Sequence, residues 1–352
     1  MSEQNCEKVM TIEEIKEMVA GPRYDFLRKN EHLAGKIMFL TLGGSYAYGT
    51  NVAGSDVDVR GCAANSMSDL VGLTNFEQVI NNETDTTVYA FNKLVGLLLN
   101  CNPNVIEMLG CKPEHYFHIT KLGQELIDNR RLFLSRKAIN AFGGYANQQL
   151  RRLENAITHD RLPQPKQEEY MRKAVEKAVE DFGSKSKILP VDAIRLYTDK
   201  SDREELEREV FADIDLKRFP VRDLRGLINE MTNIIGNYDK LNGRNKKKDD
   251  AHLAKHAMHL IRLYLMCLDI LEKEEIVTYR EADHDMLMEI RNGKYMNEDG
   301  TYQQEFFDMV NDLEKRLQYA KENTALPAHP NMKRVGELVE YVNMEVLMHG
   351  GV

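Results

Sequence analysis

The sequence predicts an α/β domain followed by an all-helical domain. In residues 1–130, short runs rich in apolar and β-branched residues alternate with segments of helical periodicity. After about Arg131 these strand patterns nearly disappear, and long helix-like segments follow one another. The chain has 352 residues, enough for two domains, and we place them at residues 1–130 and 131–352.

The first domain should begin with a helix over Thr11–Lys29. Thr11 can cap it, and Glu13 and Glu14 suit the positive end of the helix dipole. Apolar and β-branched runs then predict strands, and an apolar helical face followed by Pro103 predicts a helix that ends there. The expected strands are Lys36–Leu42, Val57–Cys62 and Thr84–Tyr89, and the expected helices are Phe91–Leu99 and Asn104–Leu109.

The second domain should consist of long helices separated by glycine and proline. Candidate stops are Gly143 with Gly144, and the Leu162–Pro165 segment. The expected helices are Ala138–Ala156, Lys166–Ser184, Phe219–Tyr238, Ala251–Lys273 and Gln303–Asn323.

Composition indicates a soluble globular protein. Hydrophobic residues make up 42% and charged residues 29% of the chain, and no apolar stretch reaches the length of a membrane span. The polar segment Met1–Lys8 does not resemble a signal peptide, so we expect a cytoplasmic protein that does not enter a membrane. The five cysteines lack zinc-site spacing, which indicates reduced thiols.

The most informative segment runs from Gly43 to Arg60. Gly44 and Ser45 follow an apolar run, where glycine lets the backbone approach a phosphate and serine adds a hydroxyl donor. Asp56 and Asp58 lie two residues apart, which places them on one face of a strand. Two adjacent carboxylates repel unless a cation lies between them, and oxygen ligands of this kind favour Mg²⁺ with substrate phosphates. The segment predicts a metal-dependent enzyme that acts on a nucleoside triphosphate.

The same segment resembles the signature of the DNA polymerase β nucleotidyltransferase superfamily, in which a Gly-Ser turn precedes Asp-x-Asp on a strand. The chain is most similar to the RNA repair pathway DNA polymerase β family. Further segments carry this resemblance: Ser55–Gly61, Asn102–Leu109, Lys255–Leu263 and Ile290–Lys294. It implies a polymerase β-like α/β domain with a mixed sheet, with Gly44, Ser45 and Ser55 at the nucleotide.

The superfamily pattern also requires a third carboxylate on a later strand. Asp85 begins a β-rich segment and is our choice to complete the metal site and take the acceptor proton. Glu83 has the same strand parity and is the alternative. Asp56, Asp58 and Asp85 are therefore the predicted catalytic and metal-binding residues.

Lys255, His259 and Arg262 lie at i, i+4 and i+7 and share one helical face. Basic side chains on one face suit phosphate binding, and the resemblance implies that a helical domain contacts the triphosphate. We therefore expect these residues to bind nucleotide. An ordinary amphipathic helix with a solvated basic stripe is the alternative.

Two further patterns have simpler interpretations. Asn104 and Glu107 have the spacing of a helix cap with its capping-box partner, although the resemblance also places them near the nucleotide. The basic run Gly243–Lys248 is more simply a solvated loop than an RNA contact. The net charge of −9 gives the whole chain no general attraction to nucleic acid.

Together these patterns predict a Mg²⁺- or Mn²⁺-dependent nucleotidyltransferase. The substrate would be a nucleoside triphosphate, with ATP as the first expectation, and the acceptor an RNA end of tRNA or damaged RNA. Nucleotidylation of a protein or small molecule is the second hypothesis. A nucleotide-binding regulator without turnover is the third, although it has no need for two repelling carboxylates. The oligomeric state is left open by the sequence.

Overall fold

The computed structural model divides the chain into two compact units. The first combines Met1–Gln148 with Met258–Arg291 and Glu305–Val352, and the second combines Gln149–Ala257 with Asn292–Gln304. These units are not the two consecutive stretches that we expected from the sequence. The structure describes residues 8–161, 164–186, 193–203, 207–217, 219–226, 228–229, 231–232, 250–298 and 300–349.

A five-stranded mixed sheet forms the centre of the first unit, with strand order β3-β4-β2-β1-β5. β1 (Ile37–Gly43) pairs antiparallel with β2 (Asp58–Ala63) and with β5 (Tyr116–Ile119). β2 pairs parallel with β4 (Thr86–Ala90), which pairs antiparallel with β3 (Gln78–Asn81). The expected mixed sheet is confirmed, whereas the short strands β3 and β5 were not predicted.

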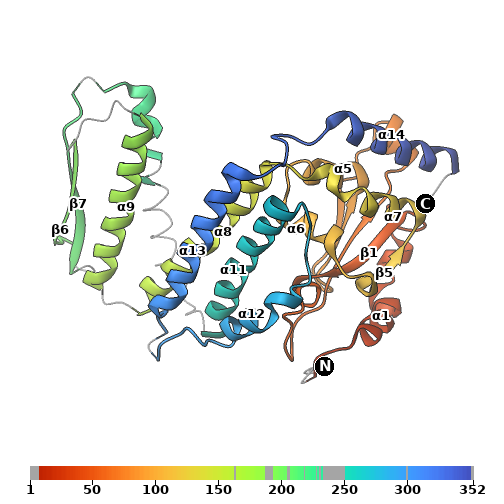
Figure 1. The fold of residues 1–352 in the computed structure, drawn as a ribbon, viewed down its shortest axis with the longest axis horizontal. Coiled ribbons are helices and arrows are strands. Elements are labelled where there is room, and N and C mark those ends of the chain that lie inside the picture. Colours follow the sequence, from red (N-terminus) through yellow and green to blue (C-terminus); the bar gives the residue numbers. More distant parts are fainter. Residues whose placement is uncertain are drawn as a thin grey trace. The chain divides into compact units, whose positions relative to one another are not determined.

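Helices cover both faces of this sheet. In Figure 1, α1 lies on one side of β1 and β5, while α5 and α7 lie on the other. Ile15 and Val19 of α1 belong to the same buried cluster as Leu40, Leu42 and Val59 of the sheet. The smaller elements around the sheet are α2 (Phe26–Lys29), α3 (Gly44–Tyr48), α4 (Met67–Val71), α5 (Phe91–Leu98), α6 (Pro103–Ile106) and α7 (Lys121–Asp128), with the 3₁₀ turns Pro22–Tyr24, Glu107–Gly110, Pro113–His115, Arg130–Phe133 and Glu281–Asp283.

The N-terminal helix is shorter than the sequence predicted. α1 spans Ile12–Ala20, and Thr11 caps it through a capping box with Glu14, as expected. The helix ends at Gly21, whose backbone is extended, and Pro22 cannot donate a hydrogen bond to continue it. The prediction of one helix through Lys29 was therefore wrong.

The long helices of the C-terminal part were mostly predicted. α8 (Lys137–Arg161) runs straight through Gly143 and Gly144, so these residues do not stop a helix. A Cβ atom on either glycine would meet no atom within 4 Å, so neither residue marks a close contact. Glycine inside a helix lowers stability only modestly. The predicted helix Phe219–Tyr238 lies partly outside the described residues. Further helices in this part of the chain are α11 (Asp250–Lys273), α12 (His284–Arg291), α13 (Gln304–Asn323) and α14 (Met332–His349).

The second unit is not all-helical. It contains α9 (Gln164–Ser186) packed against an antiparallel hairpin of β6 (Ile194–Lys200) and β7 (Arg208–Ile214). In β6, partly buried residues alternate with exposed ones, which is the period of a strand with one covered face. The prediction of an all-α second domain was wrong here, although the alternation is present in the sequence.

Two further predictions concern membranes and thiols. Within the described residues, no helix combines the length and the apolar character needed to cross a membrane. Cys62, Cys101, Cys111 and Cys267 are free thiols. Burial raises the pKa of Cys111 to about 12 and that of Cys267 to about 12, so both are protonated at neutral pH and neither suits a nucleophile.

Candidate active site

The start of α3 lies directly against the carboxylate of Asp58. Gly43 pairs with Asp58 across the β1–β2 ladder, and Gly44 follows with φ 56°. A Cβ atom on Gly44 would stand 1.9 Å from Asp58 Oδ2, closer than any real contact. Only glycine fits both the backbone conformation and the space, so the Gly-Ser turn and the carboxylate form one tightly packed element.

The turn itself is a short helix rather than a loop. Gly49, with φ 75°, caps the C-terminal end of α3, and the N–H of Thr50 donates to the Ser45 carbonyl at 2.9 Å. A Cβ atom on Gly49 would meet the ring of Tyr279 at 2.6 Å. Ser45 is half-buried in the first turn of α3. The two glycines thus fix both ends of the element that carries Ser45.

Asp56 and Asp58 differ in their surroundings. Asp58 is the first residue of β2, and its side chain is 25% exposed. Asp56 precedes the strand and is exposed. The hydroxyl of Ser55 accepts a hydrogen bond from the N–H of Val52 at 2.9 Å, which shapes the loop before Asp56. The strand begins later than predicted, so strand alternation alone does not place both carboxylates on one face.

Arg60 is a site residue that we did not predict. Its Nη2 atom lies 2.7 Å from Asp58 Oδ1, and its Nη1 atom donates to the carbonyl of Asp85. The i, i+2 spacing on β2 was a usable signal, because it places Arg60 and Asp58 on the same face. The guanidinium relieves the charge repulsion that we had expected a metal ion alone to relieve.

Asp85 lies just before the neighbouring strand β4, beside the start of β2. The N–H of Val59 donates to the Asp85 carbonyl at 3.2 Å, next to the parallel pair Val59 and Thr86. Asp85 has φ 44°, a left-handed conformation that aspartate tolerates better than most residues, and its side chain is exposed. Glu83 is also exposed, and both residues precede β4, so strand parity does not distinguish them.

A buried cluster links three distant segments that carried the family resemblance. Arg262 of α11 is 1% exposed, and its Nη1 atom lies 3.3 Å from Glu107 Oε2. The Tyr48 hydroxyl of α3 donates to Glu107 Oε1 at 2.8 Å, and the guanidinium stacks 3.6 Å from the centre of the Tyr48 ring. Burial raises the pKa of Glu107, although the adjacent Arg262 opposes this effect.

This cluster corrects two sequence-based expectations. Arg262 is 1% exposed and paired with Glu107, so it is not a solvent-facing cation on an amphipathic helix. Glu107 is not a capping-box residue, because Asn102 caps the turn through the N–H of Asn104 at 3.1 Å. His259 shares a helical face with Arg262, as predicted, and its Nε2 atom lies 3.3 Å from Arg262 Nη2.

The remaining basic residues keep their predicted roles as hypotheses. Lys255 is exposed and belongs to the second unit. The basic run Gly243–Lys248 lies outside the described residues.

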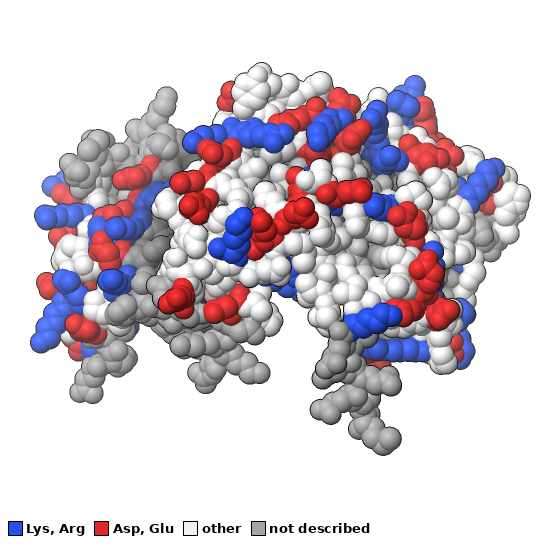
Figure 2. Space-filling model, turned by 60° about the horizontal axis from the view of Figure 1, so that its bottom comes forward, with Lys and Arg blue, Asp and Glu red and all other residues white. Residues whose placement is uncertain are grey.

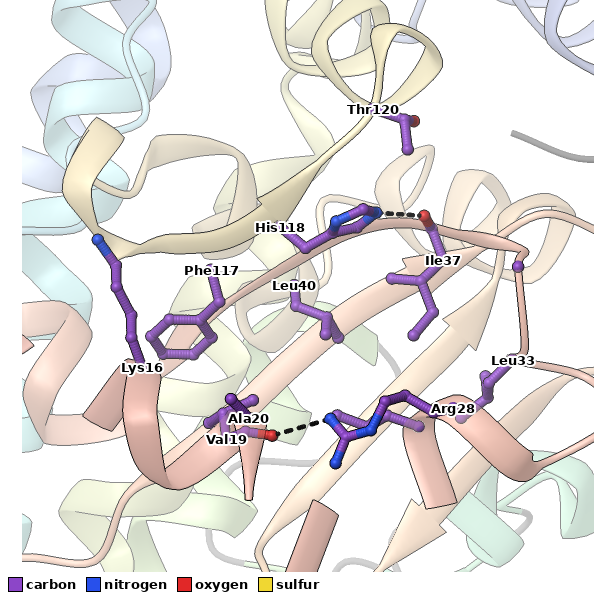
Figure 3. A pocket seen from close by; sticks show the side chains of 12 residues that line it. Lys16, Val19, Ala20, Arg28, Leu33, Ile37, Leu40, Phe117, His118 and Thr120 are labelled. Atoms are coloured by element: carbon purple, nitrogen blue, oxygen red, sulfur yellow. Dashed lines mark hydrogen bonds between the residues drawn. The ribbon is translucent and has the colours of Figure 1, made fainter. Parts of the chain in front are cut away.

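A cavity of about 590 Å³ lies elsewhere in the first unit. Residues of α1, α2, β1 and β5 line most of this open pocket, and Figure 3 shows Lys16 and Phe117 on one side with Arg28 on the other. It adjoins Ile37, the first residue of β1, whereas the Asp58 site adjoins Gly43 at the other end of that strand. Its lining includes none of the predicted site residues.

The comparison with known families agrees with this geometry. A family model described as the RNA repair pathway DNA polymerase beta family matches residues 1–219. The chain belongs to this family. The match includes the whole five-stranded sheet and the α3 turn, whereas Lys255–Leu263 and Ile290–Lys294 lie outside it. A search of curated proteins finds no match.

The sequence predicts a Mg²⁺ ion held by Asp56, Asp58 and Asp85. Among the described residues, no group of three or more Asp, Glu, His or Cys side chains is arranged to hold a metal. Mg²⁺, however, is commonly bound through one or two carboxylates together with substrate phosphates. Asp56 and Asp58 supply oxygen donors of that kind, and Asp58 lies directly against the backbone of the Gly44 turn. The donor chemistry therefore fits Mg²⁺ bound together with its nucleotide.

Proposed function

We propose that this member of the family transfers a nucleoside monophosphate from a triphosphate to an acceptor hydroxyl. The acceptor oxygen attacks the α-phosphorus, the bond from that phosphorus to the bridging oxygen breaks, and pyrophosphate leaves. The observation that carries the proposal is the contact between Gly44 and Asp58, where an added Cβ would stand 1.9 Å from the carboxylate. A phosphate on this turn would necessarily lie next to the carboxylate.

Each residue would contribute by position and charge, which is what phosphoryl transfer requires of a protein. The Gly44 backbone and the Ser45 hydroxyl would contact the triphosphate. Asp56 and Asp58 would hold Mg²⁺, which when bound neutralises charge on the phosphates. Asp85, which immediately precedes β4 and lies beside the start of β2, would take the proton of the acceptor hydroxyl.

For the acceptor we propose an RNA end, with the family description as the support. Figure 2 shows Lys and Arg side chains interspersed with Asp and Glu over the described residues of the face in view. With a net charge of −9, RNA binding would depend on local contacts rather than on the field of the whole protein.

The test is a transfer assay with each of the four triphosphates labelled at the α-phosphate, with Mg²⁺ or Mn²⁺ and total RNA. We expect label in RNA. Asp56→Asn and Asp58→Asn should abolish transfer while the protein stays folded. Asp312→Asn is the matched control, because this carboxylate on α13 is 76% exposed and forms only a surface pair with Lys315.

The alternatives give different results. Label in protein or in a small alcohol would replace RNA as the acceptor. Triphosphate binding without transfer to any acceptor would indicate a regulator rather than an enzyme. Full transfer by Asp58→Asn would contradict the assigned role of this carboxylate.

A further inference from the structure

Arg291, the last residue of α12, carries a guanidinium without a carboxylate partner among the described residues. Its Nη2 atom lies 3.4 Å from the Ser55 hydroxyl, a long hydrogen bond. Its Nη1 atom is buried and has no hydrogen-bond partner in the described part of the chain. The side chain is half-buried, and burial lowers the pKa of Arg291.

Other buried arginines of the first unit have carboxylate partners. Arg262 contacts Glu107, and Arg280 contacts both Asp269 and Asp283. A guanidinium withdrawn from water is unfavourable unless an anion and hydrogen-bond acceptors replace its hydration. Arg291 therefore has the surroundings of an arginine whose counter-ion is supplied by a bound ligand.

The position of Arg291 indicates which anion this is. Its contact, Ser55, immediately precedes Asp56 and is held by the N–H of Val52. Gly54, with φ 78°, turns the chain just before it. The guanidinium therefore lies at the loop that carries a candidate metal-binding carboxylate. A phosphate that shares a Mg²⁺ ion with this carboxylate would lie close to Arg291.

We propose that Arg291 binds a phosphate of the nucleoside triphosphate, in the role that the sequence had suggested for Arg262. The inference rests on the proposed function for the identity of the ligand. Arginine suits the role, because its planar fork of donors matches two phosphate oxygens.

The test measures binding without turnover. A non-hydrolysable triphosphate and the corresponding nucleoside are titrated with Mg²⁺ into the full chain, and a 3′-hydroxyl RNA is titrated separately. Arg291→Met should weaken triphosphate binding about ten- to a hundred-fold, the usual effect of a charge-assisted hydrogen bond to phosphate. Arg291→Lys should recover part of this loss, and binding of the nucleoside and of RNA should not change.

Thermal unfolding of the ligand-free protein separates a binding role from a structural one. Arg291→Met should keep or raise the unfolding midpoint, because it removes a buried charge that lacks a counter-ion. Arg334→Met is the matched control, since this arginine of α14 is exposed. It should leave both binding and stability unchanged.

Several outcomes would overturn the inference. If RNA binding falls and triphosphate binding does not, the guanidinium contacts the acceptor. If neither changes, or if stability falls while affinity is retained, Arg291 has no ligand role. If the wild-type chain does not bind the triphosphate, the inference fails at once. If it binds the triphosphate through Arg291 but transfers nothing, the inference stands and the proposed function fails.

Discussion

Replacing Glu107 by glutamine should destabilise the protein strongly, although the change is nearly isosteric. Glutamine can still accept the hydrogen bond from Tyr48, but it carries no charge for Arg262. The Arg262 side chain is 1% exposed. Without the carboxylate, its guanidinium would keep only its stacking contact with the Tyr48 ring and its contacts with other neighbouring side chains. Arginine cannot lose its proton in this setting, so the buried charge remains.

Removal of one partner from a buried ion pair costs about 3–5 kcal/mol. For a domain of this size, that corresponds to a fall in the unfolding midpoint of roughly 2–4 °C per kcal/mol. The double variant Glu107→Gln/Arg262→Met should recover most of the loss, because replacing both charges by neutral groups of similar volume is often nearly neutral. The recovery is the result that distinguishes a charge effect from a packing defect.

Arg262→Met alone should behave differently with pH. Burial already raises the pKa of Glu107, and loss of the guanidinium raises it further. A carboxyl whose pKa is higher in the folded than in the unfolded protein stabilises the fold at low pH and loses that contribution as pH rises through the folded value. The deficit of Arg262→Met should therefore shrink as the pH is lowered below neutrality.

Unfolding can be followed by circular dichroism or tyrosine fluorescence, because the chain contains no tryptophan. The control is the pair Arg316 and Glu272, whose side chains are 51% and 27% exposed. Its single variants should cost at most about 1 kcal/mol. If Glu107→Gln costs no more than Glu272→Gln, or if the double variant is as unstable as the sum of its parts, the argument from charge is refuted.

Three further predictions concern the site and its surroundings. Gly44→Ala should destabilise the protein and abolish transfer, because the added Cβ would stand 1.9 Å from Asp58 Oδ2 and force this carboxylate to move. Asp85→Asn should reduce turnover strongly and preserve triphosphate binding, whereas Glu83→Gln should leave both unchanged. His115 is buried, and burial lowers its pKa from 6.5. The neutral imidazole therefore stabilises the fold above pH 6.5, and this contribution is lost as the pH falls through the lower pKa of the folded state. His115→Phe should reduce this acid sensitivity in unfolding measurements.

Each of these has a clear opposite result. Gly96→Ala is the control for Gly44→Ala, because a Cβ on this α5 glycine would contact nothing within 4 Å and alanine favours a helix by roughly 0.5–1 kcal/mol. Equal activity of the two alanine variants would mean that the Gly44 contact is unimportant. An inactive Glu83→Gln with an active Asp85→Asn would assign the third carboxylate to Glu83. An unchanged pH profile in His115→Phe would remove His115 as the cause of acid sensitivity.

Local patterns predicted structural elements whose residues lie close together in the sequence. The Gly44 turn, the start of β2 near Asp58 and the cap at Thr11 all depend on neighbouring residues. Strands β3 and β5 were missed because four residues each are too few to establish a period. Arg60 was missed because we considered only carboxylates on its strand face.

Long-range pairing could not be predicted in the same way. Glu107 and Arg262 are separated by 155 positions, and nothing near either residue identifies the other. Arg262 therefore looked like a surface cation on an amphipathic helix, and Glu107 looked like a cap residue. The environment that distinguishes them is created only when α11 packs beside the 3₁₀ turn Glu107–Gly110.

The discontinuous path of the chain affects how the protein can be divided for study. A fragment of residues 1–148 contains the sheet, Tyr48 and Glu107, but it lacks the segment Met258–Arg291 of the same compact unit. It would leave the Glu107 carboxylate without Arg262, and it would lack Arg291. Two of the points at which the chain passes from one unit to the other also fall inside helices, one in α8 and one in α11. An N-terminal fragment cut after the sheet should therefore be poorly folded, and its inactivity would carry no information about catalysis.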